Sequence, residues 1–446
     1  MSNKKKYAFL INHGVEVRHF ILSGLLQQVQ ASNDACILVR QEIDSPALKE
    51  YISQYHVEAV RLPFASSLKR RHRLEAYITA IRKARKRVKG LGNFHNFQKE
   101  NRGISMRDRI LSFPLVVKLA MYVGIKKLRQ HYTQTEVVDF LQQQHITDLV
   151  LLEYNSPLLL LFGFSANHSN IKVHVVMNTL KTFFVNDFIP FSLHRFYAWN
   201  LEQTKLFQQS NPHQNKESIV CGGNPYYAFF VNSMFDAEVE NVQSKYAALQ
   251  GKKWIVYSLI YEKMFAHEYA LLEILNNAIT ELFAKENRPC LLIRRNPFEE
   301  KVELIEKLAR LENVIIADHL WERDSEKEWS IQYVQGEKEW KLFLQQAALC
   351  MNIPSMAGYE AIISGTPVLN IGFDAEGKPS VELEHFTKAP FMKDVNQSEF
   401  IEVCTTTDML KKELPIWLNK KNEQRKEYIR SSLDFILFDC KDFLLH

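Results

Sequence analysis

The amino-acid sequence predicts an α/β fold in which two Rossmann-like domains face a cleft. Three observations support this prediction. The 446 residues exceed what a single hydrophobic core usually organises. Short aliphatic runs alternate with amphipathic ones over the first 230 residues, which is typical of βαβ units. The same alternation starts again near residue 252, after a polar stretch.

The first half should begin with three strands separated by two helices, and the alternation resumes after a basic segment. The expected elements are strands at 7–14, 34–39 and 59–64, helices at 16–31 and 46–56, and further α/β units over 137–227. The predicted N-terminal domain is therefore 1–240, with a basic helical insertion at about 66–132.

The second half shows the same alternation. Its expected elements are strands at 252–261, 289–298 and 313–318, helices at 267–287 and 301–311, and a strand-helix-strand unit at 352–374. This domain is predicted to cover 250–420. The remaining residues, 421–446, should form a helical tail that crosses back to the first domain.

Composition indicates a globular protein of a reducing compartment. Hydrophobic residues make up 46% and charged residues 24% of the chain, enough for two cores. The apolar start is too short for a signal peptide, and no run approaches the roughly 18 apolar residues of a membrane span. We expect a cytoplasmic protein without disulfides or a metal site, because the six cysteines are widely separated: Cys36, Cys221, Cys290, Cys350, Cys404 and Cys440.

Positive charge is concentrated in one segment. Residues 69–129 hold 18 Lys or Arg and 3 acids, a net +15, whereas the whole chain carries only +5. Anionic membranes attract such clusters, and 111–130 is amphipathic enough to lie in an interface. The expected partner is thus the anionic inner-membrane surface, contacted through 69–130, with solvated helices as the alternative. Nucleic acid is not expected, since few aromatic residues interleave with the charges.

The stretch NIPSMAGYEAIISGTPVLNIGFD, from Asn352 to Asp374, has the pattern strand, turn, helix, turn, strand. Ser355, Met356 and Ala357 would then lie at a helix N-terminus, where backbone N–H groups and the helix dipole bind phosphate. Glu360 follows about one turn later and could accept hydrogen bonds from ribose hydroxyls. The alternative is an ordinary N-capped helix.

Two other predicted strands of the second half end in polar residues. Arg294 and Arg295 follow one of them, and guanidinium groups suit diphosphates. Ser258 ends the first strand of this half in the same way. The alternative for the arginines is pairing with Glu299 and Glu300 at the surface.

Loops of the first half offer candidates for acid–base chemistry. The loop after the first strand carries His13, Glu16 and Arg18, a natural place for a general base, although a structural role is equally open. A second polar loop follows the strand at 172–178, and its candidates are Asn178, Thr179, Lys181 and Asp187.

Several common motifs are missing from the sequence. It contains no GxGxxG, no phosphate-binding GxxxxGK[ST] and no GxSxG, which disfavours Rossmann oxidoreductases, NTPases and serine hydrolases. It also contains no Asp-x-Asp, a pattern that holds a metal-bound nucleotide diphosphate. We therefore expect chemistry that needs no metal.

With these motifs in view, 352–374 resembles the donor-site signature of GT-B glycosyltransferases. The chain is similar to bacterial surface-polysaccharide glycosyltransferases of that fold in five segments: MNTLKTFF, RFYAWN, VCGGNPYYAFF, NIGFD and ELEHFTK. The resemblance implies that Ser355, Met356 and Glu360 line the donor nucleotide and that Arg294 contacts it, although Asn296 replaces the usual His before Pro297. It also matches Asp374 and His385, and it places His13 and Glu16 where inverting members keep a base.

The resemblance implies a glycosyltransferase that moves a sugar from a nucleotide-sugar donor to a glycan or lipid-linked glycan acceptor and uses no cofactor. Asn352 stands where many retaining members have a glutamate, which favours inversion, with His13, Glu16 or Asp187 as the base. Two alternatives remain: a nucleotide-sugar 2-epimerase of the same architecture, and a non-catalytic scaffold that binds polysaccharide machinery. An epimerase would need no lipid acceptor and would leave the basic segment unexplained.

Overall fold

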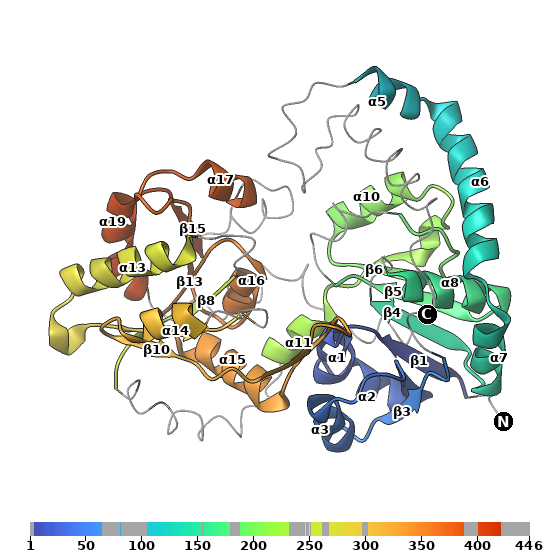
Figure 1. The fold of residues 1–446 in the computed structure, drawn as a ribbon, viewed down its shortest axis with the longest axis horizontal. Helices are drawn as coiled ribbons and strands as arrows, with labels where there is room; N and C mark the ends of the chain where they lie inside the picture. Colours follow the sequence, from blue (N-terminus) through green and yellow to red (C-terminus); the bar gives the residue numbers. More distant parts are fainter. Residues whose placement is uncertain are drawn as a thin grey trace. The chain divides into compact units, whose positions relative to one another are not determined.

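The computed structural model divides into two compact units (Figure 1). It describes residues 4–64, 81, 105–152, 156–178, 188–231, 246, 249, 251–260, 267–296, 302–387 and 400–420. Of these residues, unit 1 contains those up to Phe229 and Asp324–Trp329, and unit 2 contains those of 230–323 and 330–420. Each unit has its own parallel sheet, so the predicted α/β class with two Rossmann-like units is confirmed.

Unit 1 is built on a seven-stranded parallel sheet of order β3-β2-β1-β4-β5-β6-β7. Its strands are rich in Val, Ile, Leu and Phe because helices cover both faces of such sheets. Their bounds are β1 Lys6–Ile11, β2 Asp34–Val39, β3 Glu58–Arg61, β4 Asp148–Leu152, β5 Lys172–Val176, β6 Arg195–Ala198 and β7 Ile219–Cys221.

The helices of unit 1 follow the strands in the alternation that the sequence predicts. They are α1 Val15–Val17, the π-helical η1 Arg18–Leu22, α2 Leu25–Gln30, α3 Pro46–Gln54, α5 Met106–Leu111, α6 Pro114–Tyr132, α7 Thr135–Gln143, α8 Pro157–His168, α10 Leu201–Ser210, the 3-10 turn η4 Lys216–Ser218 and α11 Pro225–Val231. The single helix expected at 16–31 is wrong. Gly24 has φ 84°, a left-handed conformation that ends the first segment and starts α2.

Unit 2 has a six-stranded parallel sheet of order β10-β9-β8-β13-β14-β15. Its core contains fully buried residues from the strands and from α13 and α19, among them Ile255, Leu271, Met351 and Leu410. The strands are β8 Trp254–Ser258, β9 Cys290–Arg294, β10 Val314–Ile316, β13 Leu349–Asn352, β14 Val368–Ile371 and β15 Ile401–Cys404. The helices are α13 Glu268–Leu282, η7 Lys285–Asn287, α14 Val302–Ala309, α15 Val334–Gln346, α16 Met356–Ile363, α17 Val381–Thr387 and α19 Thr407–Leu418.

A small two-stranded sheet interrupts this alternation, and the sequence analysis did not predict it. β11 Trp321–Asp324 pairs with β12 Trp329–Gln332. The turn between them contains Glu328 with φ 50°. These two strands are short and consist mainly of charged and polar residues. They lack the apolar run by which the sequence predicts a buried strand, so they were not predicted.

The predicted basic insertion is described only from residue 105 onward, where it forms α5 and α6. Most of 66–104 and all of the predicted tail at 421–446 lie outside the described residues. Among the helices that the structure describes, none is both long and apolar enough to cross a membrane.

Candidate functional site

In each sheet the strand order reverses its direction at one point. Polar side chains lie beside that point. In unit 1, β1 is followed outward by β2 and β3 on one side and lies beside β4 on the other; in unit 2, β8 and β13 form the corresponding pair. Ligands of open α/β sheets bind beyond the carboxyl ends of the strands at such switch points.

In unit 2, the helix N-terminus predicted at Ser355 is present. Ser355 has extended dihedral angles and its Oγ accepts a hydrogen bond from the Ala357 N–H at 3.3 Å. Asn352, the last residue of β13, donates from Nδ2 to the same Oγ at 3.3 Å. Ser355 and Met356 are half-buried and Ala357 is buried. The first turn of α16 thus presents backbone N–H groups at the carboxyl edge of the sheet, an arrangement that suits an anion.

Two buried asparagines lie on β13 and β14, the strands that precede and follow α16. Asn352 pairs in register with Asn370 on β14, and both side chains are essentially inaccessible to solvent. Neither Oδ1 has a hydrogen-bond partner among the described residues. A buried amide oxygen without a partner costs free energy, so such groups are typical of sites that a ligand or water completes.

Arg294, Trp340 and Glu360 form a connected cluster. The Arg294 guanidinium lies 4.2 Å from the centre of the Trp340 ring, and its Nη2 donates to Gln332 Oε1 at 2.6 Å. The Trp340 indole Nε1 donates to Glu360 Oε2 at 2.6 Å, and Glu360 is only 6% exposed. Arg294 and Glu360, two of the residues predicted to contact nucleotide, are thus both held by the Trp340 indole, which the sequence did not predict at the site.

Arg295 is placed differently from its neighbour. No hydrogen bond or ion pair ties its guanidinium to another described residue, and it is half-buried just beyond the end of β9. Burial lowers the pKa of His319, and the charge of Arg295 lowers it further. Of the two predicted arginines, Arg295 is therefore the one available to a diphosphate. Glu299 and Glu300, its alternative partners, lie outside the described residues.

Ser258 is half-buried at the end of β8, and a buried carboxylate organises the residues after it. Glu268 accepts hydrogen bonds from the Ile260 N–H at 3.0 Å and from the Tyr257 hydroxyl at 3.0 Å. Burial and this carboxylate raise the pKa of Tyr257 well above its usual value. Glu268 therefore fixes the loop beside the candidate site.

The two remaining candidates of unit 2 lie further along the chain. Asp374 Oδ1 accepts hydrogen bonds from the N–H groups of Glu376 at 2.9 Å and Lys378 at 3.0 Å, so this carboxylate caps a turn. His385 belongs to α17, and its side chain is outside the described part.

In unit 1, His13 has a defined hydrogen-bond environment after β1. Its Nδ1 lies 3.0 Å from the Glu328 carbonyl oxygen, and its Nε2 lies 2.6 Å from Asn12 Nδ2. Because an amide nitrogen donates and a carbonyl accepts, the neutral imidazole with its proton on Nδ1 satisfies both contacts. Asn12 also donates to Ser156 Oγ at 3.2 Å, which links the residues that follow β1 and β4.

Glu16 and Arg18 lie beside His13 in the sequence and have different surroundings. Glu16 is buried, and its Oε2 accepts a hydrogen bond from the His13 N–H at 2.9 Å. Arg18 lies 4.1 Å above the Tyr226 ring and also donates to its hydroxyl. His19, whose ring centre lies 5.6 Å from that of Tyr226, is held neutral because burial lowers its pKa to about 3.

The second polar loop is described only at its start. Asn178 is half-buried just after β5, and its backbone carbonyl interacts with His19. Thr179, Lys181 and Asp187 lie outside the described residues, so these candidates remain predictions. Within the described part of the chain, no group of three His, Cys, Asp or Glu side chains could hold a metal ion.

Comparison with known proteins places the fold. No family model matches the chain, and no curated protein matches it by sequence. Among solved structures, it is similar over 99% of its length to all of a Neisseria meningitidis UDP-GlcNAc 2-epimerase bound to UDP-GlcNAc, with a TM-score of 0.53 and 12% identity.

Two further solved structures give the same result. A Methanocaldococcus jannaschii UDP-GlcNAc 2-epimerase in complex with UDP-GlcNAc and UDP matches with a TM-score of 0.52 and 12% identity, covering 96% of this chain and 99% of that one. A UDP-N-acetylglucosamine 2-epimerase from Rickettsia bellii matches with a TM-score of 0.54 and 9% identity, covering 99% and 96%. At these identities the likeness shows the fold alone.

The comparisons support the predicted GT-B-type fold and correct the predicted activity. The glycosyltransferase interpretation is corrected, because the three full-length neighbours described above are UDP-GlcNAc 2-epimerases and match the stated alternative better. A turn of this kind, between a strand end and a helix N-terminus, is compatible with different reactions on the same fold, so the pattern at 352–374 carries no information about which reaction follows.

Proposed function

We propose that this protein is a nucleotide-sugar 2-epimerase, with a UDP-linked N-acetylhexosamine as the first substrate to test. The observation that carries the proposal is the polar carboxyl edge of unit 2, where the α16 N-terminus and Arg295 are both available to a diphosphate. The full-length fold similarity to 2-epimerases supports this reaction in preference to transfer of the sugar.

The diphosphate is assigned to unit 2 for reasons of charge. Backbone N–H groups at the start of α16 carry partial positive charge, and Arg295 adds a full charge in a fork that matches phosphate oxygens. The unpartnered Oδ1 atoms of Asn352 and Asn370 are acceptors, so they suit donors such as sugar hydroxyl groups and do not contribute to binding the diphosphate. The nucleotide-sugar is proposed as the only small molecule required, since the chain itself supplies groups that stabilise the diphosphate.

Inversion at C2 requires a proton to leave that carbon and a proton to return on the opposite face. A C2–H bond of a sugar is not acidic, but its electron pair can form a C1=C2 double bond while the C1–O bond to the diphosphate breaks. The nucleoside diphosphate then leaves with both electrons of that bond, and positive groups stabilise its charge. Addition of a proton to C2 from the other face and reformation of C1–O complete the change.

His13 is the proposed proton acceptor, and Glu16 is a positioning residue. With its proton on Nδ1, the His13 imidazole has an unprotonated Nε2, which accepts from Asn12 in this structure and acts as the base once the C2–H group replaces that contact. The Glu16 carboxylate fixes the His13 backbone from a buried position. Asp187 remains a second candidate for proton transfer.

The test is to incubate the purified protein with UDP-GlcNAc in D2O, without any acceptor, and to follow C2 by NMR. The 2-epimer should form, and it should carry deuterium at C2. His13→Gln should abolish both the conversion and the isotope exchange. Absence of conversion and of exchange for UDP-GlcNAc and other nucleotide-HexNAc substrates would reject the epimerase and leave the scaffold alternative.

A matched pair of variants tests the assignment of the diphosphate. Arg295→Ala should raise the Kd for UDP about tenfold or more, because a hydrogen bond to a charged group contributes roughly 1.5–3 kcal/mol. Arg310→Ala, which removes an exposed arginine of the same unit, should leave it unchanged. Equal UDP affinities for these two variants, measured by isothermal titration calorimetry, would contradict the assignment.

A further inference from the structure

Helices α5 and α6 carry an apolar strip that faces away from the core of unit 1. Met106, Ile110, Phe113, Leu115, Leu119 and Tyr122, here called the α5–α6 ridge, are 55–79% exposed. Isolated exposed apolar residues are normal on a protein surface, whereas a contiguous strip marks a contact with another molecule or with a membrane.

The spacing of the ridge shows that it is separate from the face that α6 uses for folding. Leu115, Leu119 and Tyr122 follow the i, i+4, i+7 pattern of one face of α6, and Met106, Ile110 and Phe113 have the same spacing from α5 to the residue that precedes α6. The residues of α6 that are buried include Val117, Leu128 and Tyr132, and α6 packs on α8. The helix is therefore held in the fold by one face, while no described residue buries the ridge.

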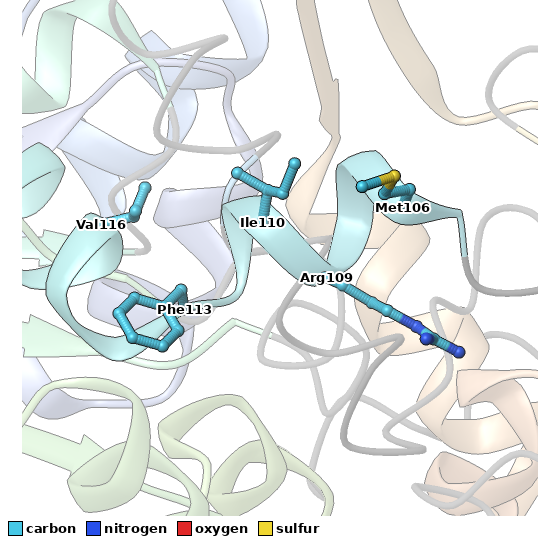
Figure 2. Close-up of a pocket in the computed structure, with 5 residues that line it drawn as sticks. All are labelled: Met106, Arg109, Ile110, Phe113 and Val116. Carbon is cyan, nitrogen blue, oxygen red and sulfur yellow. The ribbon is translucent and has the colours of Figure 1, made fainter.

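The ridge is also hollowed at α5. A cavity of about 630 Å³ is lined there by Met106, Ile110, Phe113, Val116 and Arg109 (Figure 2). Among these described lining residues, Arg109 alone is polar. An apolar hollow with one guanidinium is suited to an amphiphile, whose apolar part enters the hollow while an anionic group meets the arginine.

Along α5 and α6 the exposed charge has one sign. Between Ser105 and Tyr132 the chain has six Lys or Arg and one acid. That acid, Asp108, is buried in a capping box with Ser105, so the exposed charge is positive. Arg107 and Arg109 lie on α5, and Lys126, Lys127 and Arg129 lie exposed on the last turns of α6.

We propose that the α5–α6 ridge docks on an anionic lipid bilayer. Its apolar side chains enter the interface between headgroups and acyl chains, and the neighbouring Lys and Arg side chains contact the lipid phosphates. A second copy of this chain would bring the same positive charge to the contact and be repelled, whereas an anionic bilayer is complementary in both polarity and charge. This inference does not depend on the epimerase reaction.

Flotation with vesicles tests the proposal on the full-length protein. The wild type should float with vesicles of phosphatidylcholine and phosphatidylglycerol, bind pure phosphatidylcholine more weakly, and lose binding to the anionic vesicles as salt rises. Leu119→Asp should weaken binding about tenfold or more, since one inserted leucine is replaced by a charge. Leu201→Asp is the matched control, because Leu201 on α10 is 67% exposed and Leu119 is 66% exposed.

A second pair of measurements separates the two parts of the interaction. Lys126→Glu with Lys127→Glu should reduce binding to anionic vesicles but leave the weak binding to phosphatidylcholine unchanged.

The proposal fails if the wild type binds neither vesicle, or if Leu119→Asp binds as tightly as Leu201→Asp. It also fails if the wild type self-associates in sedimentation and Leu119→Asp abolishes that association, since the ridge would then contact a second copy. Conversion of UDP-GlcNAc, measured without vesicles, reports on the proposed function separately.

Discussion

At the scale of single residues, the indole of Trp340 has two roles in unit 2. Its ring lies against Arg294 and its Nε1 donates to the buried Glu360 carboxylate. Trp340→Phe keeps an aromatic ring beside Arg294 but removes the donor. We expect the free energy of unfolding to fall by about 1–3 kcal/mol, the usual penalty when a buried polar group loses a partner.

Trp329→Phe is the control for this change. Trp329 is also buried, but its Nε1 has no hydrogen-bond partner among the described residues. This variant loses similar ring volume without breaking a hydrogen bond, so it should be less destabilising than Trp340→Phe in urea unfolding. Equal losses would show that the hydrogen bond to Glu360 contributes nothing measurable.

His19 makes the stability of unit 1 depend on pH. Burial lowers the pKa of its imidazole from 6.5 to about 3 in the folded state. Between these values the unfolded chain binds a proton at this residue and the folded chain does not, so stability falls as pH decreases from about 6.5 towards 3. In His19→Phe this contribution is absent.

The measurement is urea unfolding of wild type and His19→Phe at several pH values from 7 to 4. The slope of unfolding free energy against pH should be smaller in the variant, by up to about 1.4 kcal/mol per pH unit, which corresponds to one proton. Parallel pH profiles for the two proteins would mean that His19 titrates normally in the folded state.

At the scale of elements, the turn between β14 and α17 requires a glycine. Gly377 has φ 77°, and an added Cβ would meet Thr407 Oγ1 inside van der Waals contact and lie 3.2 Å from Thr407 Cβ. The Gly377 carbonyl also accepts a hydrogen bond from the Thr407 N–H at 3.1 Å, which joins this turn to the start of α19. The constraint therefore has both a conformational and a steric part.

Gly377→Ala and Gly251→Ala separate these two parts. Gly251, in the same unit, has φ 72° but open space around the added methyl group. Both variants bear the cost of about 1–2 kcal/mol for a left-handed L-residue, and Gly377→Ala should lose about 1 kcal/mol or more beyond it. Equal shifts in the melting temperature would show that Thr407 moves aside at no cost.

Element by element, the sequence predicted the buried strands best. β8, β9 and β13 lie within or directly beside their predicted ranges because short aliphatic runs identify fully buried parallel strands. The N-terminus of α16 was also predictable, since a Ser at the end of a strand is a common cap. The β11–β12 pair and the division of the first helix at Gly24 were not predicted, because they depend on polar contacts and on one backbone dihedral angle.

The composition of the candidate site was less predictable than its location. Arg294 and Glu360 both lie at the carboxyl edge of the sheet, as predicted. Trp340 contacts each of them, but it lies on α15, where the sequence has no recognisable binding motif. Periodicity along a sequence predicts which side chains are buried. It does not predict which buried polar groups meet across separate elements, and Arg295 could be distinguished from Arg294 only through these contacts.

At the scale of the whole molecule, the two units should respond differently to a nucleotide. UDP at a hundred times its Kd stabilises the state that binds it by about 2.7 kcal/mol. Because the proposed contacts belong to unit 2, hydrogen exchange should slow mainly in peptides that cover β13 and α16. Protection that is confined to unit 1, or no protection at saturating UDP, would contradict the assignment of the diphosphate.

The strand order of unit 1 has a consequence for how the chain is made. β1 lies between β2 and β4 in the sheet. It pairs with β4 through residues such as Tyr7 and Asp148, and β4 comes much later in the chain than β2. At roughly 5–20 residues per second, a ribosome needs on the order of ten seconds to reach β4 after β2 has emerged. During that interval one apolar strand edge of the nascent chain has no neighbour, and slow closure of distant strands is expected from such a topology. The newly synthesised protein should therefore depend on chaperones that bind exposed strand edges before the sheet is complete.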